Sequence, residues 1–156
     1  MPTPGEWPTQ DLVSHRVAST PDRTAIVDAD TGERVTYRDL DAAVARRATA
    51  LDRHCDRDQP TVAVLLDTGL AFAEVVFAVQ RLGGRLVPLN VRLTPSELTA
   101  QCERLDLDLL VCGSDTEATA AEVTDAPVAS VDEPERDDGV ELTAPAAAAP
   151  DPVALD

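Results

Sequence analysis

The residues that could perform acid–base chemistry are few and scattered in this sequence. His15 and His54 are far apart, and neither has the nearby partners that a general base or a metal ligand needs, so we expect surface or helix-capping roles. Asp106 and Asp108 are neighbouring carboxylates, but they straddle a predicted helix-to-strand turn. A solvated turn explains this pair better than a catalytic one.

The cysteines also lack the spacing of a reactive or metal-binding site. Cys55, Cys102 and Cys112 form no Cys-x-x-Cys pair. An odd, scattered set argues against a disulfide framework and against a zinc site. We expect reduced thiols that are mostly buried.

Motifs that bind phosphate or create a nucleophile are absent from the sequence. A P-loop requires a lysine, and all 13 basic residues are arginines. No G-x-G-x-x-G segment follows a predicted strand, and no G-x-S-x-G nucleophile elbow occurs. We therefore predict no catalytic, cofactor-binding or metal-ligating residue in this chain.

The charge balance excludes two classes of partner. The 156 residues include 29 Asp and Glu, which gives a formal net charge of -16. Nucleic acids and anionic membranes would repel such a protein. Adaptation to a high-salt cytoplasm explains the excess of acid, because salt screens the repulsion. A GC-rich genome is the alternative, although it explains the absence of lysine and not the abundance of Asp.

No targeting or membrane segment is recognisable. The N-terminus lacks a basic region followed by an apolar run, so no signal peptide is predicted. No apolar stretch approaches the roughly 18 residues that a membrane helix needs. The sequence predicts a soluble, cytoplasmic protein.

Strand-like and helix-like segments alternate along the chain. Helices are predicted at residues 11–19, 40–51, 70–82, 94–105 and 116–123, and strands at 24–28, 34–37, 61–66, 85–89, 107–112 and 127–131. In the second helix, apolar residues recur on one face. Its charged residues, Asp41 among them, lie largely away from that stripe, which predicts a solvated face. The first two strands flank a turn and are expected to form a hairpin.

Local signals fix several element boundaries. The pair Gly83-Gly84 ends the apolar third helix and allows close packing on a sheet. Pro88 cannot donate a ladder hydrogen bond, so it marks a strand end or an edge. Thr94 and Glu97 bracket Pro95 in a capping box at the start of the fourth helix.

The alternation indicates an α/β fold with an incomplete parallel or mixed sheet and flanking helices. Residues 1–131 are assigned to a partial domain, and residues 132–156 to an acidic, Pro- and Ala-rich loop or tail. The helices are expected to be too few to cover both faces of the sheet. The helix at 70–82 is apolar nearly all round and also needs more cover. We interpret the chain as part of something larger.

Four segments together resemble the adenylate-forming (AMP-binding) acyl-CoA synthetase superfamily. They are TPDRTAIV at 20–27, VTYRDL at 35–40, LGGRLVPLN at 82–90 and RLTPSEL at 92–98. The resemblance implies the N-terminal segment of the large N-terminal domain. Within the superfamily it points most to haloarchaeal 2-succinylbenzoate–CoA ligases, followed by fatty-acid–CoA ligases.

The resemblance implies an ATP-dependent, AMP-forming carboxylic acid–CoA ligase that uses ATP, Mg and coenzyme A. The phosphate loop and the other catalytic parts of that family have no counterpart in this sequence, so the segment is expected to be inactive alone and to bind none of these cofactors. Its expected partners are the remainder of its own chain and, in the full-length enzyme, a small carboxylic acid. The alternative is a stand-alone α/β binding or assembly module without catalysis.

Overall fold

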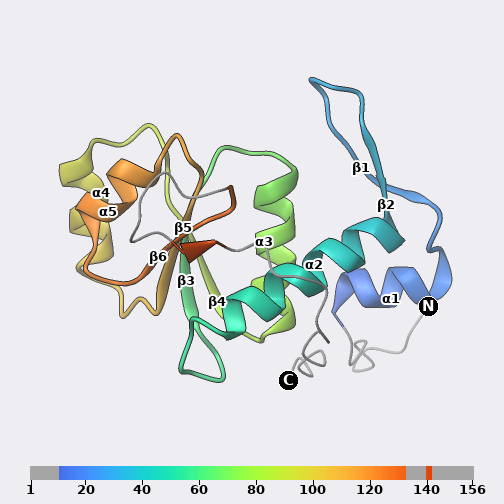
Figure 1. Ribbon diagram of the computed structural model, residues 1–156, viewed down its shortest axis with the longest axis horizontal. Helices are drawn as coiled ribbons and strands as arrows, with labels where there is room; N and C mark the ends of the chain where they lie inside the picture. The colour runs from blue at the N-terminus through green and yellow to red at the C-terminus, as the bar shows by residue number, and fades with distance from the viewer. Residues whose placement is uncertain (1–10, 133–139, 142–156) are drawn as a thin grey trace, which may run out of the picture.

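The computed structural model describes residues 11–132 and 140–141, and Figure 1 shows their arrangement. The helices are α1 (Leu12–Ser19), α2 (Tyr37–Asp52), α3 (Leu70–Arg81), α4 (Pro95–Cys102) and α5 (Glu117–Val123). The strands are β1 (Thr24–Val27), β2 (Arg34–Thr36), β3 (Thr61–Leu65), β4 (Arg85–Pro88), β5 (Leu109–Cys112), β6 (Val128–Ser130) and β7 (Val140–Glu141).

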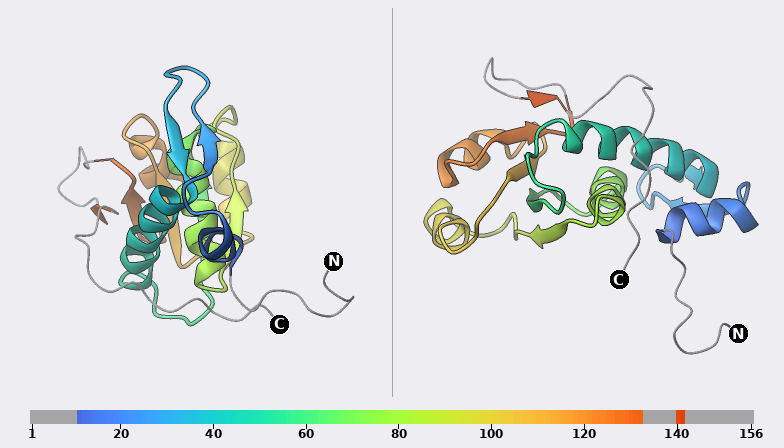
Figure 2. Two further views of the ribbon diagram at one scale, coloured as in Figure 1. Left: turned by 90° about the vertical axis from the view of Figure 1, so that its right-hand side faces the viewer. Right: turned by 90° about the horizontal axis from the view of Figure 1, so that it is seen from below.

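The main sheet has five strands in the order β4-β3-β5-β6-β7, and every pairing is parallel. One core cluster joins α1, α2 and α3 to alternate residues of the central strands, namely Val62, Val64, Leu109 and Val111. A second cluster joins α4 and α5 to the intervening residues, namely Ala63, Leu65, Leu110 and Cys112. The predicted α/β class is confirmed as a sheet between two helical layers, which Figure 2 shows in its right-hand view.

The expectation that too few helices cover the sheet is wrong at its centre. Every residue of β3 and of β5 is buried. The α3 crossover from β3 to β4 lies on one face of the sheet and the α4 crossover from β4 to β5 lies on the other, so the helices of this chain cover both faces of β3 and β5. The edge strand β4 is less covered, because Arg85 and Pro88 are exposed and the two residues between them are half-buried.

Helix α3 is only partly enclosed, as its apolar composition predicts. Val75, Ala78, Val79 and Arg81 are buried, whereas its other residues are half-buried. A helix that is apolar on several sides keeps part of that surface open unless further elements pack on it.

The hairpin of β1 and β2 lies outside the main sheet. The two strands pair antiparallel, which confirms the predicted hairpin. Neither strand contains a buried residue. Figure 1 shows the hairpin and α1 at one end of the molecule, beyond α2 and α3, with α4 and α5 at the opposite end.

The residues predicted to begin or end helices and strands do so in the structure. Thr94 caps α4, and its side chain and that of Glu97 form the reciprocal capping box. Gly83 has a φ of 64°, in the left-handed region. A Cβ on Gly84 would lie 2.7 Å from the carbonyl oxygen of Pro60, so the glycine permits a close approach of α3 to the start of β3. Pro88 ends the edge strand β4.

Several boundaries differ from the expected ones, and helix α2 begins at Tyr37 instead of Leu40. Helix α4 ends at Cys102 instead of near Leu105, because the amides of Arg104 and Leu105 bond three residues back in tighter turns. Strand β7, at Val140–Glu141, lies within the region predicted to be a tail and pairs with β6. The rest of that region, 133–139 and 142–156, is outside the described residues. Among the helices that the structure describes, none has the length and apolar character needed to cross a membrane.

Candidate functional site

The carboxyl edge of the parallel sheet is the place where an open α/β fold normally binds ligands. Such sites form where neighbouring strands send their connections to opposite faces. Here that point lies between β3 and β5, since β3 leads to α3 on one face and β5 leads to α5 on the other. The candidate site is therefore built from the loops after these strands, residues 66–69 and 113–116.

Hydrogen bonds tie these loops together. The Thr116 hydroxyl donates to the carbonyl of Leu65 over 2.8 Å and accepts the amide N–H of Gly113 over 3.1 Å. The Ser114 amide donates to Asp132 Oδ2 over 3.1 Å, which joins the loop after β5 to the end of β6. The hydroxyl of Thr116 and the carboxylate of Asp132 thus fix the conformation of the loops at this edge.

The charge at this edge opposes nucleotide binding. The side chains of Asp67, Asp115 and Asp132 are exposed there. Carboxylates repel phosphates, and the arginine and lysine donors that phosphates require do not occur in either loop. ATP and coenzyme A therefore do not fit this donor set. Among the described residues, no cluster of three or more His, Cys, Asp or Glu is suited to hold a metal ion.

The structure separates the two histidines. His15 is exposed on α1, and His54 is half-buried just beyond the end of α2. Burial, followed by the charge of Arg53, lowers the pKa of His54. The histidines thus lie on different elements, and the structure does not bring them together.

The cysteines are all free thiols, with Cys102 and Cys112 buried and Cys55 half-buried. Burial, followed by nearby carboxylates, raises the pKa of Cys112 to about 12 and that of Cys55 to about 11. Because the thiolate is the reactive form, these cysteines are poor nucleophiles at neutral pH.

Asp108 is not the solvated turn residue that the sequence suggests. Its side chain is 12% exposed and accepts the amide N–H of Thr61 at the start of β3 over 2.8 Å. Arg57 bridges it to Asp106, at 3.2 Å and 2.7 Å respectively. Asp106 alone is exposed as predicted. The pair therefore anchors the loop before β3 and is not an acid–base pair.

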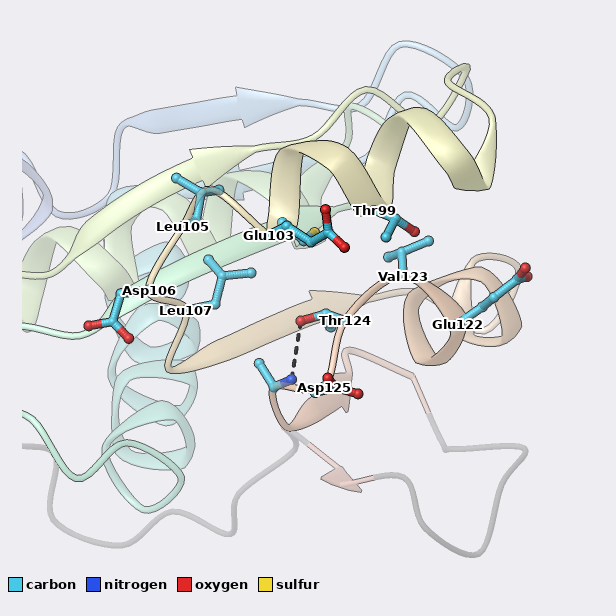
Figure 3. A pocket seen from close by; sticks show the side chains of 11 residues that line it. Thr99, Glu103, Leu105, Asp106, Leu107, Glu122, Val123, Thr124 and Asp125 are labelled. Carbon is cyan, nitrogen blue, oxygen red and sulfur yellow. Dashed lines mark hydrogen bonds between the residues drawn. The ribbon is translucent and has the colours of Figure 1, made fainter.

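A hollow of about 430 Å³ opens at the amino ends of β5 and β6, between α4 and α5 (Figure 3). Four carboxylates line it, those of Glu103, Asp106, Glu122 and Asp125. Thr124 uses its hydroxyl to accept the amide of Ala126 over 3.1 Å. The lining contains no histidine and no basic side chain, so the hollow holds neither a base–nucleophile pair nor an anion site.

The most elaborate polar cluster is one that the sequence did not reveal. Arg81 of α3 is 3% exposed and bonds Asp11 over 3.0 Å, Asp41 over 2.6 Å and the Ser14 hydroxyl over 3.0 Å. Asp41 is therefore not part of a solvated face. Asp11 also caps α1 by accepting the amides of Val13 and Ser14. The cluster joins α1, α2 and α3, and its charges are satisfied internally, so its role is structural.

Comparison with known proteins identifies a family. Residues 13–154 match the family described as AMP-binding enzyme. The 4-coumarate–CoA ligase 5 of Oryza sativa subsp. japonica is 34% identical over 98 residues, which are 63% of this chain and 18% of that protein. The 2-succinylbenzoate–CoA ligase of Bacillus thuringiensis subsp. konkukian is 33% identical over 106 residues, 68% of this chain and 22% of that protein. The chain thus spans about a fifth of the length of these relatives.

Solved structures agree with these matches. The Bacillus subtilis O-succinylbenzoate coenzyme A synthetase, in complex with ATP and magnesium ion, aligns with a TM-score of 0.72 and 31% identity over 80% of this chain and 33% of that chain. A structure named as a putative long-chain-fatty-acid CoA ligase, from Rhodopseudomonas palustris, aligns with a TM-score of 0.75 and 25% identity, over 88% of this chain and 36% of that chain.

Proposed function

The chain belongs to the AMP-binding enzyme family, and from this we propose that it is the N-terminal portion of an ATP-dependent, AMP-forming carboxylic acid–CoA ligase. The favoured acid is 2-succinylbenzoate, and a fatty acid is the next choice. We place the protein in the cytoplasm of an organism that maintains high internal salt, as its acidity suggests.

The observation that carries this proposal is the shared fold and sequence with the Bacillus subtilis O-succinylbenzoate coenzyme A synthetase. The preference for 2-succinylbenzoate rests on the recurrence of that acid among both curated relatives and solved structures. The fatty-acid alternative rests on the Rhodopseudomonas palustris structure.

The role of this portion is architectural. Its ordered helices fix a parallel sheet whose carboxyl edge bears carboxylates and hydrogen-bonded loops. ATP, Mg and coenzyme A supply the adenylation and thioester chemistry in such a ligase, and the residues described here do not suit their phosphates. We therefore assign the binding of these groups to the rest of the enzyme.

One observation favours the alternative of a stand-alone α/β module. The inner strands β3 and β5 are buried on both faces by helices of this chain alone, so the sheet does not need outside cover at its centre. Such a module would bind a partner or assemble without catalysis.

A chimera distinguishes the ligase portion from the stand-alone module. This chain replaces the matching part of the Bacillus subtilis synthetase, and acyl-CoA formation is measured by mass spectrometry with ATP, magnesium, coenzyme A and either 2-succinylbenzoate or a fatty acid. We expect acyl-CoA well above the background of the synthetase lacking that part. A soluble chimera that melts cooperatively but forms no acyl-CoA contradicts the proposed function.

A further inference from the structure

An open groove of about 300 Å³ lies between α1, β1, α2 and α3. We call it the α1 groove, and its apolar walls include Leu12, Ala25, Ile26, Tyr37 and Phe77. Leu12 is 55% exposed, and within the described part of the chain only Val27, at 51%, is another large hydrophobic residue that lies exposed. The groove is thus an apolar surface that the described residues leave uncovered.

The chemistry of the groove favours an aromatic occupant. Arg16 is the one charged side chain among the residues that line it, and its guanidinium carbon lies 5.1 Å from the centre of the Tyr37 ring. A guanidinium is attracted to the faces of aromatic rings, and tryptophan is its strongest partner. Phe77 is half-buried in the groove and offers a further ring for stacked or edge-to-face contact.

The chain carries such an occupant next to the groove. Trp7 is the single tryptophan of the sequence and lies in residues 1–10, which are outside the described residues. The described chain begins at Asp11, directly before Leu12 on the groove wall. The four residues from Trp7 to Asp11 can span up to about 14 Å, whereas α1 rises only about 6 Å from Leu12 to Arg16. Trp7 is therefore tethered within reach of the whole side of the groove that α1 forms.

We propose that residues 1–10 fold back on α1 and that the indole of Trp7 occupies the α1 groove. Burial of apolar surface drives this docking, since a large aromatic side chain can bury about 150–250 Å². The indole covers the exposed side chain of Leu12, contacts Phe77 and meets the guanidinium of Arg16. This inference does not depend on the proposed function.

Charge and tethering both favour this segment over a second copy of the chain. A second copy would bring another net charge of -16 to the contact, whereas Glu6 is the one charged side chain in residues 1–10. Glu6 also brings a carboxylate toward Arg16. A segment on a short tether has an effective concentration of about 1 mM, which a separate molecule in a dilute sample does not reach.

The fluorescence of the single tryptophan tests the proposal directly. Emission wavelength and acrylamide quenching are measured for the full 156-residue chain, both folded and in denaturant. Leu12→Asp places a charge on the exposed wall of the groove. Ala100→Asp is the matched control, because Ala100 is exposed on α4 at the opposite end of the molecule. Circular-dichroism melts show whether each variant is folded, and sedimentation velocity gives its oligomeric state.

In the folded wild type we expect emission at a shorter wavelength than in denaturant and several-fold weaker quenching, because a docked indole is shielded from water and from acrylamide. Leu12→Asp should return both signals most of the way to their values in denaturant, since docking would bury an unpaired charge. Ala100→Asp should leave both signals unchanged.

A double-mutant cycle provides a second measurement. Trp7→Ala should lower the melting temperature of the wild type by about 3 °C or more, because it removes the buried ring. In the Leu12→Asp background the same change should cost less than about 1 °C, since the two side chains no longer touch.

A folded wild type whose Trp7 emission and quenching match those in denaturant overturns the proposal. Shielding that Leu12→Asp does not reduce would place the indole outside the groove, and would overturn it as well. Shielding that appears only together with a dimer would identify a second copy as the occupant, and a chain without a cooperative melt would have no groove to fill. Either of these results also overturns the proposal.

Discussion

Arg81 is the residue on which three helices converge. Its side chain is buried with Asp11, and Asp41 completes the contact from α2. A buried ion pair adds little net stability over an apolar replacement of the whole cluster, but removal of one partner leaves charge buried without compensation. The cluster therefore fixes the position of α1 on the α2–α3 layer.

Replacing Arg81 by Met tests this role. We expect Arg81→Met to lower the free energy of unfolding by about 3–5 kcal/mol, because Asp11 loses its cation in a buried site. The control is Arg38→Met, whose ion pair with Asp22 is exposed at both side chains and should contribute about 0–1 kcal/mol. Denaturant unfolding at neutral pH measures both. If both variants lose the same free energy of unfolding, the buried Arg81 cluster stabilises the protein no more than the exposed ion pair of Arg38 does.

The same cluster predicts a pH dependence. Burial raises the pKa of Asp11, but hydrogen bonds from Arg81 and the Ser14 amide outweigh it, and the net effect lowers the pKa below 3.8. A lowered pKa in the folded state means that the stabilisation is complete above the unfolded value and is lost as pH falls through the folded value. The difference between the wild type and Arg81→Met should therefore narrow below about pH 3.8. A constant difference down to pH 2 would contradict this assignment.

Gly84 tests the close packing of α3 on the sheet. A Cβ there would lie 2.7 Å from the backbone oxygen of Pro60, which cannot move without shifting β3. We expect Gly84→Ala to lower the free energy of unfolding by about 1–3 kcal/mol. At Gly69 a Cβ meets no atom within 4 Å, so Gly69→Ala should cost at most about 1 kcal/mol as a change of N-cap. A smaller effect at Gly84 than at Gly69 would refute the packing argument.

At the scale of elements, most of the order of helices and strands follows from local signals. Hydrophobic periodicity places α2, and the glycine pair with Pro88 bounds α3 and β4, because these signals act over a few residues. The Arg81 cluster could not be predicted in this way, since Arg81 and Asp11 are separated by 70 positions and ion pairing over that distance depends on the tertiary fold. The sequence does not indicate the anchoring role of Asp108 for the same reason, because its partner amide lies on β3.

The capping box of α4 is the element-level signal most open to test. Thr94 accepts the amide of Glu97, and the Glu97 carboxylate accepts the amide and the hydroxyl of Thr94. We expect Thr94→Ala to cost about 1 kcal/mol of unfolding free energy. Ser96→Ala, an exposed position in the same turn, should change it by less than about 0.5 kcal/mol. Thermal unfolding measures the loss in both variants. If Thr94→Ala and Ser96→Ala lower the unfolding free energy equally, the capping box does not stabilise the protein.

At the scale of the whole molecule, the net charge of -16 is the dominant electrostatic property. Salt shortens the range of repulsion from about 10 Å at 0.1 M to about 3 Å at 1 M. We expect the melting temperature to rise by about 5 °C or more between 0.1 M and 3 M KCl, as like-charge repulsion in the folded state is screened. A flat or falling melting temperature would remove the support for a high-salt origin.

We propose that this chain supplies architecture to a ligase and no catalytic group. Its most direct test is the kcat for acyl-CoA formation by the chimera in which Asp67, Asp115 and Asp132, the carboxylates of the carboxyl edge, are replaced together by Asn. The account predicts a kcat within about threefold of the parent chimera, whereas loss of a general acid or base costs about 100-fold or more. A folded variant whose kcat falls by that larger factor would contradict it.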